Sequence, residues 1–190
     1  MCLPLFRRLR RILPGLLLAS AGLLSSCETS RRQSFPEVSS PVNDPTKTEQ
    51  RQLEATSKLV ADIAEGKTQY SIPRDQLTHN FIREFADGTV VDKVMIRKVQ
   101  ERPKDAPVYY LVGLGLKDGM FRGMAIPLRK SSDNSLYLSS NTERYILEGV
   151  GCTFCFFNFQ GNKIVGTTCE ENTGGSSCDL TVKDNNTFFR

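Results

Sequence analysis

The first regular pattern of apolar and polar positions has the period of a helix and covers residues 47–65. Thr46 and Glu49 have the spacing of a capping box, in which two side chains hydrogen bond to free backbone N–H groups at a helix start. One helical stripe collects the apolar side chains Leu53, Leu59, Val60, Ile63 and Ala64. Gly66 then favours a helix end. We therefore predict an amphipathic helix over residues 47–65.

Downstream of this helix the pattern changes to the two-residue period of strands. Residues 81–85 and 90–99 flank Asp87-Gly88, a pair typical of tight turns, and predict a hairpin. Further strands, separated by turn residues, are predicted at residues 109–116, 123–128, 136–138, 145–147, 153–159 and 163–168. The predicted fold is α+β: the N-terminal amphipathic helix packs on an antiparallel β-meander whose C-terminal end is stapled by disulfides.

The first 26 residues have the organisation of a secretory signal. Their basic cluster comprises Arg7, Arg8, Arg10 and Arg11. It precedes residues 12–24, a mostly apolar run of 13 residues, which is shorter than the roughly 20 apolar residues of a spanning helix. Small residues follow this run, as they do before a cleavage site. We predict that residues 1–26 are a signal peptide that is removed.

The end of this segment, Leu24-Ser25-Ser26-Cys27, resembles the lipobox of bacterial lipoproteins. The resemblance implies that the Cys27 thiol is diacylated, that the peptide bond before it is cut, and that the new amino terminus is acylated, for example with palmitate. Two or three acyl chains hold a protein on a membrane, because each buried methylene contributes about 0.8 kcal/mol. Glu28 stands where an Asp commonly retains lipoproteins in the inner membrane, so we expect the outer membrane.

Residues 27–46 are predicted to be a flexible tether between the lipid and the domain. Their turn-forming and polar residues include Ser30, Ser34, Pro36, Ser39, Ser40, Pro41 and Pro45. Residues 29–32 lack the acidic cluster that directs some lipoproteins to the cell surface, which favours the periplasmic face. The remaining residues, 47–190, are expected to form a single globular domain.

Charge excludes nucleic acid as the expected partner. The chain has 25 basic and 21 acidic residues, and its formal net charge is +4. Four of the basic residues belong to the signal, so the remainder has 21 of each sign. Binding to nucleic acid depends on a basic surface that neutralises phosphates, and a neutral domain does not provide one by default.

Four of the six cysteines remain after processing, because Cys2 leaves with the signal and Cys27 carries lipid. They are Cys152, Cys155, Cys169 and Cys178. An even number of cysteines in an exported domain predicts two disulfides. A turn at residues 160–162 brings Cys169 opposite residues 152–154, which favours a Cys152–Cys169 bond and leaves Cys155 for Cys178.

A metal site and a redox site are the alternatives for these cysteines. Residues 153–159 are rich in β-branched and aromatic side chains and predict a strand, in which residues three apart face opposite sides. Cys152 and Cys155 are therefore not expected to bind one metal ion. A redox C-x2-C motif is expected at a helix start, where the thiol pKa is lowered. We expect no cofactor and no metal, and keep a thiol–disulfide redox protein, or another periplasmic enzyme that uses Cys152 and Cys155, as the alternative.

No group of residues requires an enzyme. His79 is the only histidine and lies at the entrance to a predicted strand, where we expect an ordinary exposed or hydrogen-bonded side chain. No serine lies in a G-x-S-x-G motif. Gly113-Leu114-Gly115 is not followed by a helix start, so it does not indicate dinucleotide binding. The function expected is therefore binding or scaffolding, with an envelope protein or a glycan as partner.

Several segments behind the lipobox resemble small uncharacterised lipoproteins of Bacteroidetes-like bacteria. The segments, which lie within residues 109–178, are Tyr109-Tyr110-Leu111-Val112, Met124-Ala125-Ile126-Pro127-Leu128, Leu136-Tyr137-Leu138 and Cys152-Thr153-Phe154-Cys155 with Phe157. The resemblance implies a lipid-anchored envelope protein and no particular activity. The predicted strand at residues 153–159 carries Phe154, Phe156, Phe157 and Phe159. These side chains point to both faces of the strand, so they are either all in the core or partly open to solvent.

Overall fold

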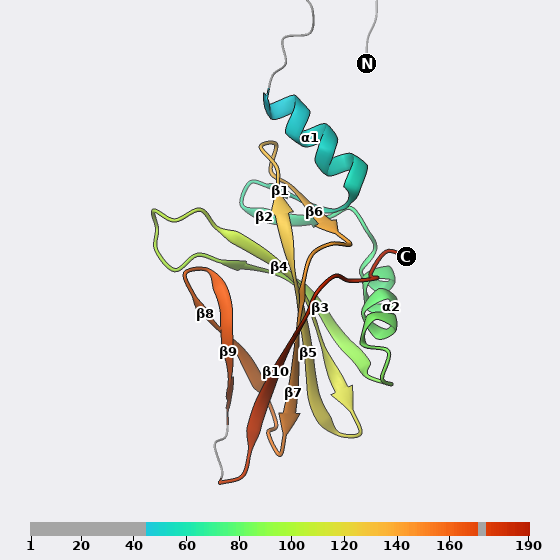
Figure 1. Cartoon of the computed structure of the whole chain (residues 1–190), viewed down its shortest axis with the longest axis vertical. Coiled ribbons are helices and arrows are strands. Elements are labelled where there is room, and N and C mark those ends of the chain that lie inside the picture. Colours follow the sequence, from blue (N-terminus) through green and yellow to red (C-terminus); the bar gives the residue numbers. More distant parts are fainter. Residues whose placement is uncertain (1–44, 171–173) are drawn as a thin grey trace, which may run out of the picture. The chain divides into compact units, whose positions relative to one another are not determined.

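The computed structural model describes residues 45–170 and 174–190, and within them the chain is mostly β (Figure 1). The two helices of this part are α1 (Pro45–Thr56) and α2 (Arg74–Phe85). Its strands are β1 (Ser57–Ala64), β2 (Lys67–Tyr70), β3 (Val90–Val99), β4 (Val108–Lys117), β5 (Met120–Lys130), β6 (Ser135–Ser139), β7 (Arg144–Val150), β8 (Cys155–Gln160), β9 (Lys163–Cys169) and β10 (Ser177–Lys183).

Strand β5 organises the main sheet. One edge of β5 pairs with β4 from Tyr109 to Lys117. The other edge pairs with β7 at residues 122–125 and with β6 at residues 129–130. The sheet continues to β3 beyond β4, to β10 beyond β7, and to β1 and then β2 beyond β6, and all these pairs are antiparallel. The sheet therefore divides in two along one edge of β5, while β8 and β9 form a separate hairpin.

Tight turns set the register of two hairpins. Asp118 and Gly119 join β4 to β5 with φ angles of 50° and 77°. Glu65 and Gly66 join β1 to β2 with φ angles of 52° and 75°. Two successive residues with positive φ make the turn whose twist matches that of the flanking strands. Lys117-Asp118-Gly119 is the turn expected between the strands predicted at residues 109–116 and 123–128, and it joins β4 to β5. The strands predicted after them correspond to β6, β7, β8 and β9.

Helix α2 covers one face of the sheet. Its side chains Leu77, Phe81 and Phe85 recur every four residues and are buried against the strands. Gly113 in β4 makes room for this helix, because a Cβ at that position would lie 2.6 Å from the Phe81 ring. The ring of Phe188, from the C-terminal segment, meets the Phe81 ring edge to face at a centroid distance of 4.7 Å.

The β8–β9 hairpin covers the opposite face. The alternation of side chains along β4 places Tyr110 and Val112 toward this hairpin, while Tyr109 and Leu111 face α2. The buried apolar residues on the hairpin side are Val99, Tyr110, Val112, Phe121, Ala125, Leu147, Cys152, Cys155, Phe157 and Ile164. The central strands are therefore buried on both faces, which explains their nearly continuous apolar sequences.

The C-terminal segment is fastened to α2 through a buried carboxylate. Glu84 is 4% exposed and pairs with Arg144 at 2.9 Å. It also accepts hydrogen bonds from the backbone N–H and the hydroxyl of Thr187. Arg83 donates to the carbonyl oxygen of Phe188 at 2.9 Å. Buried charge is thus compensated by pairing, as a stable core requires.

The predicted helix over residues 47–65 is wrong beyond Thr56. The residues that follow form β1, which pairs with β6 on one side and β2 on the other. In this strand Val60 and Ala61 have no exposed surface. The predicted fold class, an α+β domain with an N-terminal helix packed on a meander, is wrong as well. The described domain is mostly β, and α2 instead of an N-terminal helix covers the sheet.

The predicted strand at residues 81–85 is also wrong, because this segment is the second half of α2. Its four-residue apolar spacing begins at Leu77, which precedes the predicted strand. Asp87-Gly88 ends the helix region and does not join two strands, since Ala86 has a left-handed φ of 54° and closes the helix with a bond to Ile82.

Candidate functional site

Two disulfides hold the β8–β9 hairpin: one joins it to β10 of the main sheet, and the other joins it to the loop between β7 and β8. Cys152 is bonded to Cys169 and Cys155 to Cys178, with Cα–Cα distances of 5.9 and 6.0 Å. Cys155 and Cys169 belong to the hairpin, while Cys178 lies in β10. The prediction of two disulfides is confirmed, and these are the pairs that the sequence favoured. Both bonds lie at the end of the hairpin that is opposite its turn, where β8 begins and β9 ends.

The register behind the pairing differs from the predicted one. Cys169 lies opposite Cys155 in the hairpin, and not opposite residues 152–154. Cys152 precedes β8 and reaches Cys169 from the adjoining loop. Gly149 in β7 leaves room for both cysteines, because a Cβ there would lie 3.1 Å from the carbonyl oxygen of Cys152 and 3.2 Å from the Cys155 sulfur.

The sulfur atoms form a compact group. Those of Cys152, Cys155 and Cys178 all lie within 4.8 Å of one another, and the Cys152 and Cys178 sulfurs are 3.5 Å apart. The geometric reason given against a shared metal ion is therefore wrong, because Cys152 is not part of the strand. A thiolate is the metal ligand of cysteine, and in this structure all four thiols are in disulfides.

An apolar cavity lies between the hairpin and strands β3 and β4. Its volume is about 160 Å³. It is lined by Met95, Arg97, Val112, Leu114, Phe154, Cys155, Phe156 and Phe157. Phe157 is buried, whereas Phe156 is 42% exposed. The phenylalanines of β8 are therefore not all in the core, and we name this space the hairpin cavity.

Arg97 is the charged residue of the hairpin cavity. Its guanidinium carbon lies 4.6 Å from the centre of the Phe159 ring, a geometry that attracts the cation to the ring face. Within residues 45–170 and 174–190, Arg97 has neither an ion-pair partner nor a hydrogen bond. Nothing in the sequence pattern around Arg97 indicates this role, because Phe159 is brought to it by the docking of the hairpin.

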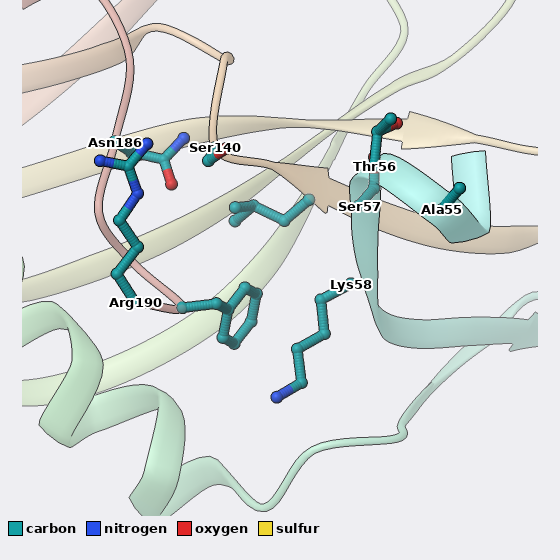
Figure 2. Close-up of a pocket in the computed structure, with 9 residues that line it drawn as sticks. Ala55, Thr56, Ser57, Lys58, Ser140, Asn186 and Arg190 are labelled. Carbon is teal, nitrogen blue, oxygen red and sulfur yellow. The ribbon is translucent and has the colours of Figure 1, made fainter. Parts of the chain in front are cut away.

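A second hollow, of about 290 Å³, lies where α1 meets β1 (Figure 2). Lys58 and Arg190 line it, together with Asn186, Ser140 and the Phe189 ring. The side-chain amide of Asn186 already has hydrogen-bond partners within the protein. It donates to the carbonyl oxygens of Ser139 and Thr142 and accepts from the N–H of Phe188. We interpret this hollow as the seam that holds the C-terminal segment.

A buried arginine connects β5, β7 and the loop that follows α2. Arg122 of β5 is 7% exposed and forms ion pairs with Asp87 and with Glu148 of β7. Burial alone would raise the pKa of Asp87. Hydrogen bonds from Thr89 and the nearby guanidinium outweigh burial, so the pKa lies below its ordinary value. Asp87, expected to be a turn residue, thus also compensates a buried cation.

The remaining sequence candidates lie apart from the hairpin cavity. His79 is exposed on α2 and does not stand at a strand entrance. Cys27, the predicted lipid attachment residue, lies outside the described residues. In the part of the chain that the structure describes, no helix is long and apolar enough to cross a bilayer.

Comparisons with known proteins give no match: no protein-family model, no curated protein and no solved structure is significantly similar to this chain.

Proposed function

We propose that this chain is a lipid-anchored protein of the bacterial cell envelope, attached through Cys27 to the periplasmic face of the outer membrane. Its domain has a binding or scaffolding role toward an envelope protein, a glycan or a smaller ligand. The lipobox resemblance of residues 24–27 and the Ser/Pro-rich tether after it support the anchor.

The observation that best supports export is the pair of disulfides. Disulfides form and persist in oxidising compartments such as the periplasm, and are rare in the cytosol, where thiols are kept reduced. A chain that begins with a basic and then apolar segment and continues into a disulfide-bonded domain has the organisation of an exported protein.

Membrane fractionation of a Cys27→Ala variant tests the anchor. We expect the wild-type chain in the detergent-soluble membrane fraction and the variant in the soluble periplasmic fraction, because a signal that is processed without lipid leaves no attachment. Cys2→Ala is the matched control, since that cysteine lies in the predicted signal and its loss is expected to change nothing. A variant that stays with the membrane contradicts the proposal.

The binding role is supported by the hairpin cavity. Apolar cavities with a few polar groups are the usual form of small-ligand sites, and the two disulfides hold the hairpin that closes this one.

A second candidate, thiol–disulfide exchange, is favoured by the 3.5 Å distance between the Cys152 and Cys178 sulfurs. A thiolate released from one disulfide would lie beside a sulfur of the other, as exchange requires. Titration of free thiols in the native protein and an insulin-reduction assay distinguish the two candidates. Catalysed reduction supports exchange, whereas the absence of both free thiols and reduction supports binding.

A further inference from the structure

We infer that the hairpin cavity binds small apolar carboxylic acids, with the apolar body inside the cavity and the carboxylate on the Arg97 guanidinium. The inference rests on the proposed binding role and gives it a ligand class. It depends on three features: the size and lining of the cavity, the state of Arg97, and the attachment of the hairpin.

The size and lining of the cavity fit a single aromatic ring or a short branched chain. Its volume of about 160 Å³ resembles that of an engineered apolar cavity of about 150 Å³ that stays dry and binds benzene. Pockets for drug-sized ligands are larger, about 300 Å³ or more. Met95, Val112, Leu114 and Phe157 offer no hydrogen bonds inside, so an apolar group is favoured there.

Arg97 supplies a carboxylate-binding group at the rim. The contact with Phe159 holds the guanidinium against an aromatic face and leaves its N–H groups without partners among the described residues. No acidic side chain lines the cavity. A guanidinium matches a carboxylate with two parallel hydrogen bonds, which an alcohol of the same shape cannot form.

The hairpin over the cavity is held in place before a ligand arrives. Cys155 lines the cavity and is bonded to Cys178 in β10, so the roof is covalently joined to the sheet. A roof that is already ordered loses little conformational entropy on binding. Phe156 is the most exposed aromatic residue of the lining, and we expect ligands to enter beside it.

A matched pair of probes tests the inference: benzoate and the neutral, similarly sized benzyl alcohol. The protein used is the full chain with Cys27→Ala and oxidised disulfides, so no detergent competes for the cavity and the result does not depend on the anchor. We expect both probes to shift the NMR signals of the Met95 and Val112 methyl groups. Benzoate is expected to bind about five- to tenfold more tightly, because a hydrogen bond to a charged group is stronger.

Three variants separate the contributions of charge and shape. Arg97→Met is expected to bind both probes equally and to retain its affinity for benzyl alcohol. Lys98→Met, which removes the adjacent exposed cation of β3, is the matched control and should keep the preference for benzoate. Leu114→Phe fills the cavity, so it should bind neither probe while its thermal unfolding temperature is unchanged or higher, as cavity-filling substitutions commonly give.

Four outcomes overturn the inference: probes that shift no signal at the cavity, equal affinity of the wild type for both, a preference that survives Arg97→Met, or undiminished binding to a folded Leu114→Phe variant. If the probes fail to bind as expected while the wild-type chain attaches to the membrane, the anchor proposal remains intact. If the probes bind the hairpin cavity but the wild-type chain, with Cys27 present, is found in the soluble fraction, only the anchor proposal is contradicted.

Discussion

At the scale of single residues, the buried carboxylate of Glu84 is expected to be important for stability. We predict that Glu84→Gln lowers the free energy of unfolding by about 3 kcal/mol, because it leaves the partly buried guanidinium of Arg144 without its counter-charge. Urea unfolding measures this loss. Glu65→Gln, at an exposed turn position, is the control and should change it by less than about 0.5 kcal/mol. Equal losses in the two variants would contradict the role of Glu84.

Gly113 is a second residue with a specific steric role. Gly113→Ala should destabilise the domain by about 1–3 kcal/mol, because the added Cβ would lie 2.6 Å from the Phe81 ring. A Phe81→Leu background removes the ring, so the same alanine substitution should cost less there. A double-mutant cycle measured by urea unfolding gives the coupling between the two sites. Additive effects would mean that strand backbone, and not the ring, limits this position.

Asp87 links stability to acid pH. Its pKa is lowered in the folded state, so its contribution is complete above the unfolded value of about 4 and is lost as the pH falls through the folded value. The difference in urea midpoint between wild type and Asp87→Asn should therefore be larger at pH 7 than near pH 2. The exposed Asp184→Asn serves as the control. A difference that does not change with pH would contradict this sign.

At the scale of elements, the disulfides are expected to stabilise the hairpin more than the rest of the domain. They join residues 17 and 23 positions apart. Closing loops of this length stabilises a fold by about 3 kcal/mol each, because the unfolded chain is constrained. Replacing Cys155 and Cys178 by alanine should make β8 and β9 sensitive to limited proteolysis, while α2 and strands β3 to β5 stay protected. Peptide mapping of the fragments measures this difference. Cleavage spread evenly over the domain would contradict it.

The same elements explain how much of the fold the sequence could predict. The β4–β5 hairpin was predictable because Asp118-Gly119 fixes its turn locally. β1 was not, because Leu59 and Ile63 lie four residues apart, a spacing that fits both a helical and a two-residue strand period, and the choice depends on the distant partner β6. The boundary of α2 was hidden because its apolar spacing begins at Leu77, in a segment rich in polar residues.

The candidate site was predictable only in part, for the same reason. Cysteine count and export indicated the disulfides, and the alternation in β8 indicated that some phenylalanines could remain open. The hairpin cavity itself depends on how β8 docks on β3 and β4, which are distant in the sequence. Arg97 gave no signal, because an exposed arginine in a strand is common until Phe159 is known to lie beside it.

At the scale of the whole domain, the C-terminal segment connects α2 to the loop between β6 and β7. Asn186 donates to the carbonyl oxygens of Ser139 and Thr142 in that loop region, while the fully buried ring of Phe188 packs on Phe81. These contacts lie on the face of the sheet opposite the disulfide-bonded hairpin. The two faces are therefore secured independently, one by a cross-link and the other by the last residues of the chain.

This arrangement predicts where a Phe188→Ala variant loosens. We expect it to lose about 3–5 kcal/mol of unfolding free energy, because a fully buried ring leaves a cavity beside α2. Hydrogen exchange should accelerate in α2 at denaturant concentrations where β8 and β9 remain protected. Phe189→Ala is the matched control: this neighbouring ring is only partly buried, so a clearly smaller loss is expected. Equal acceleration in α2 and the hairpin would show that the two faces unfold as one unit.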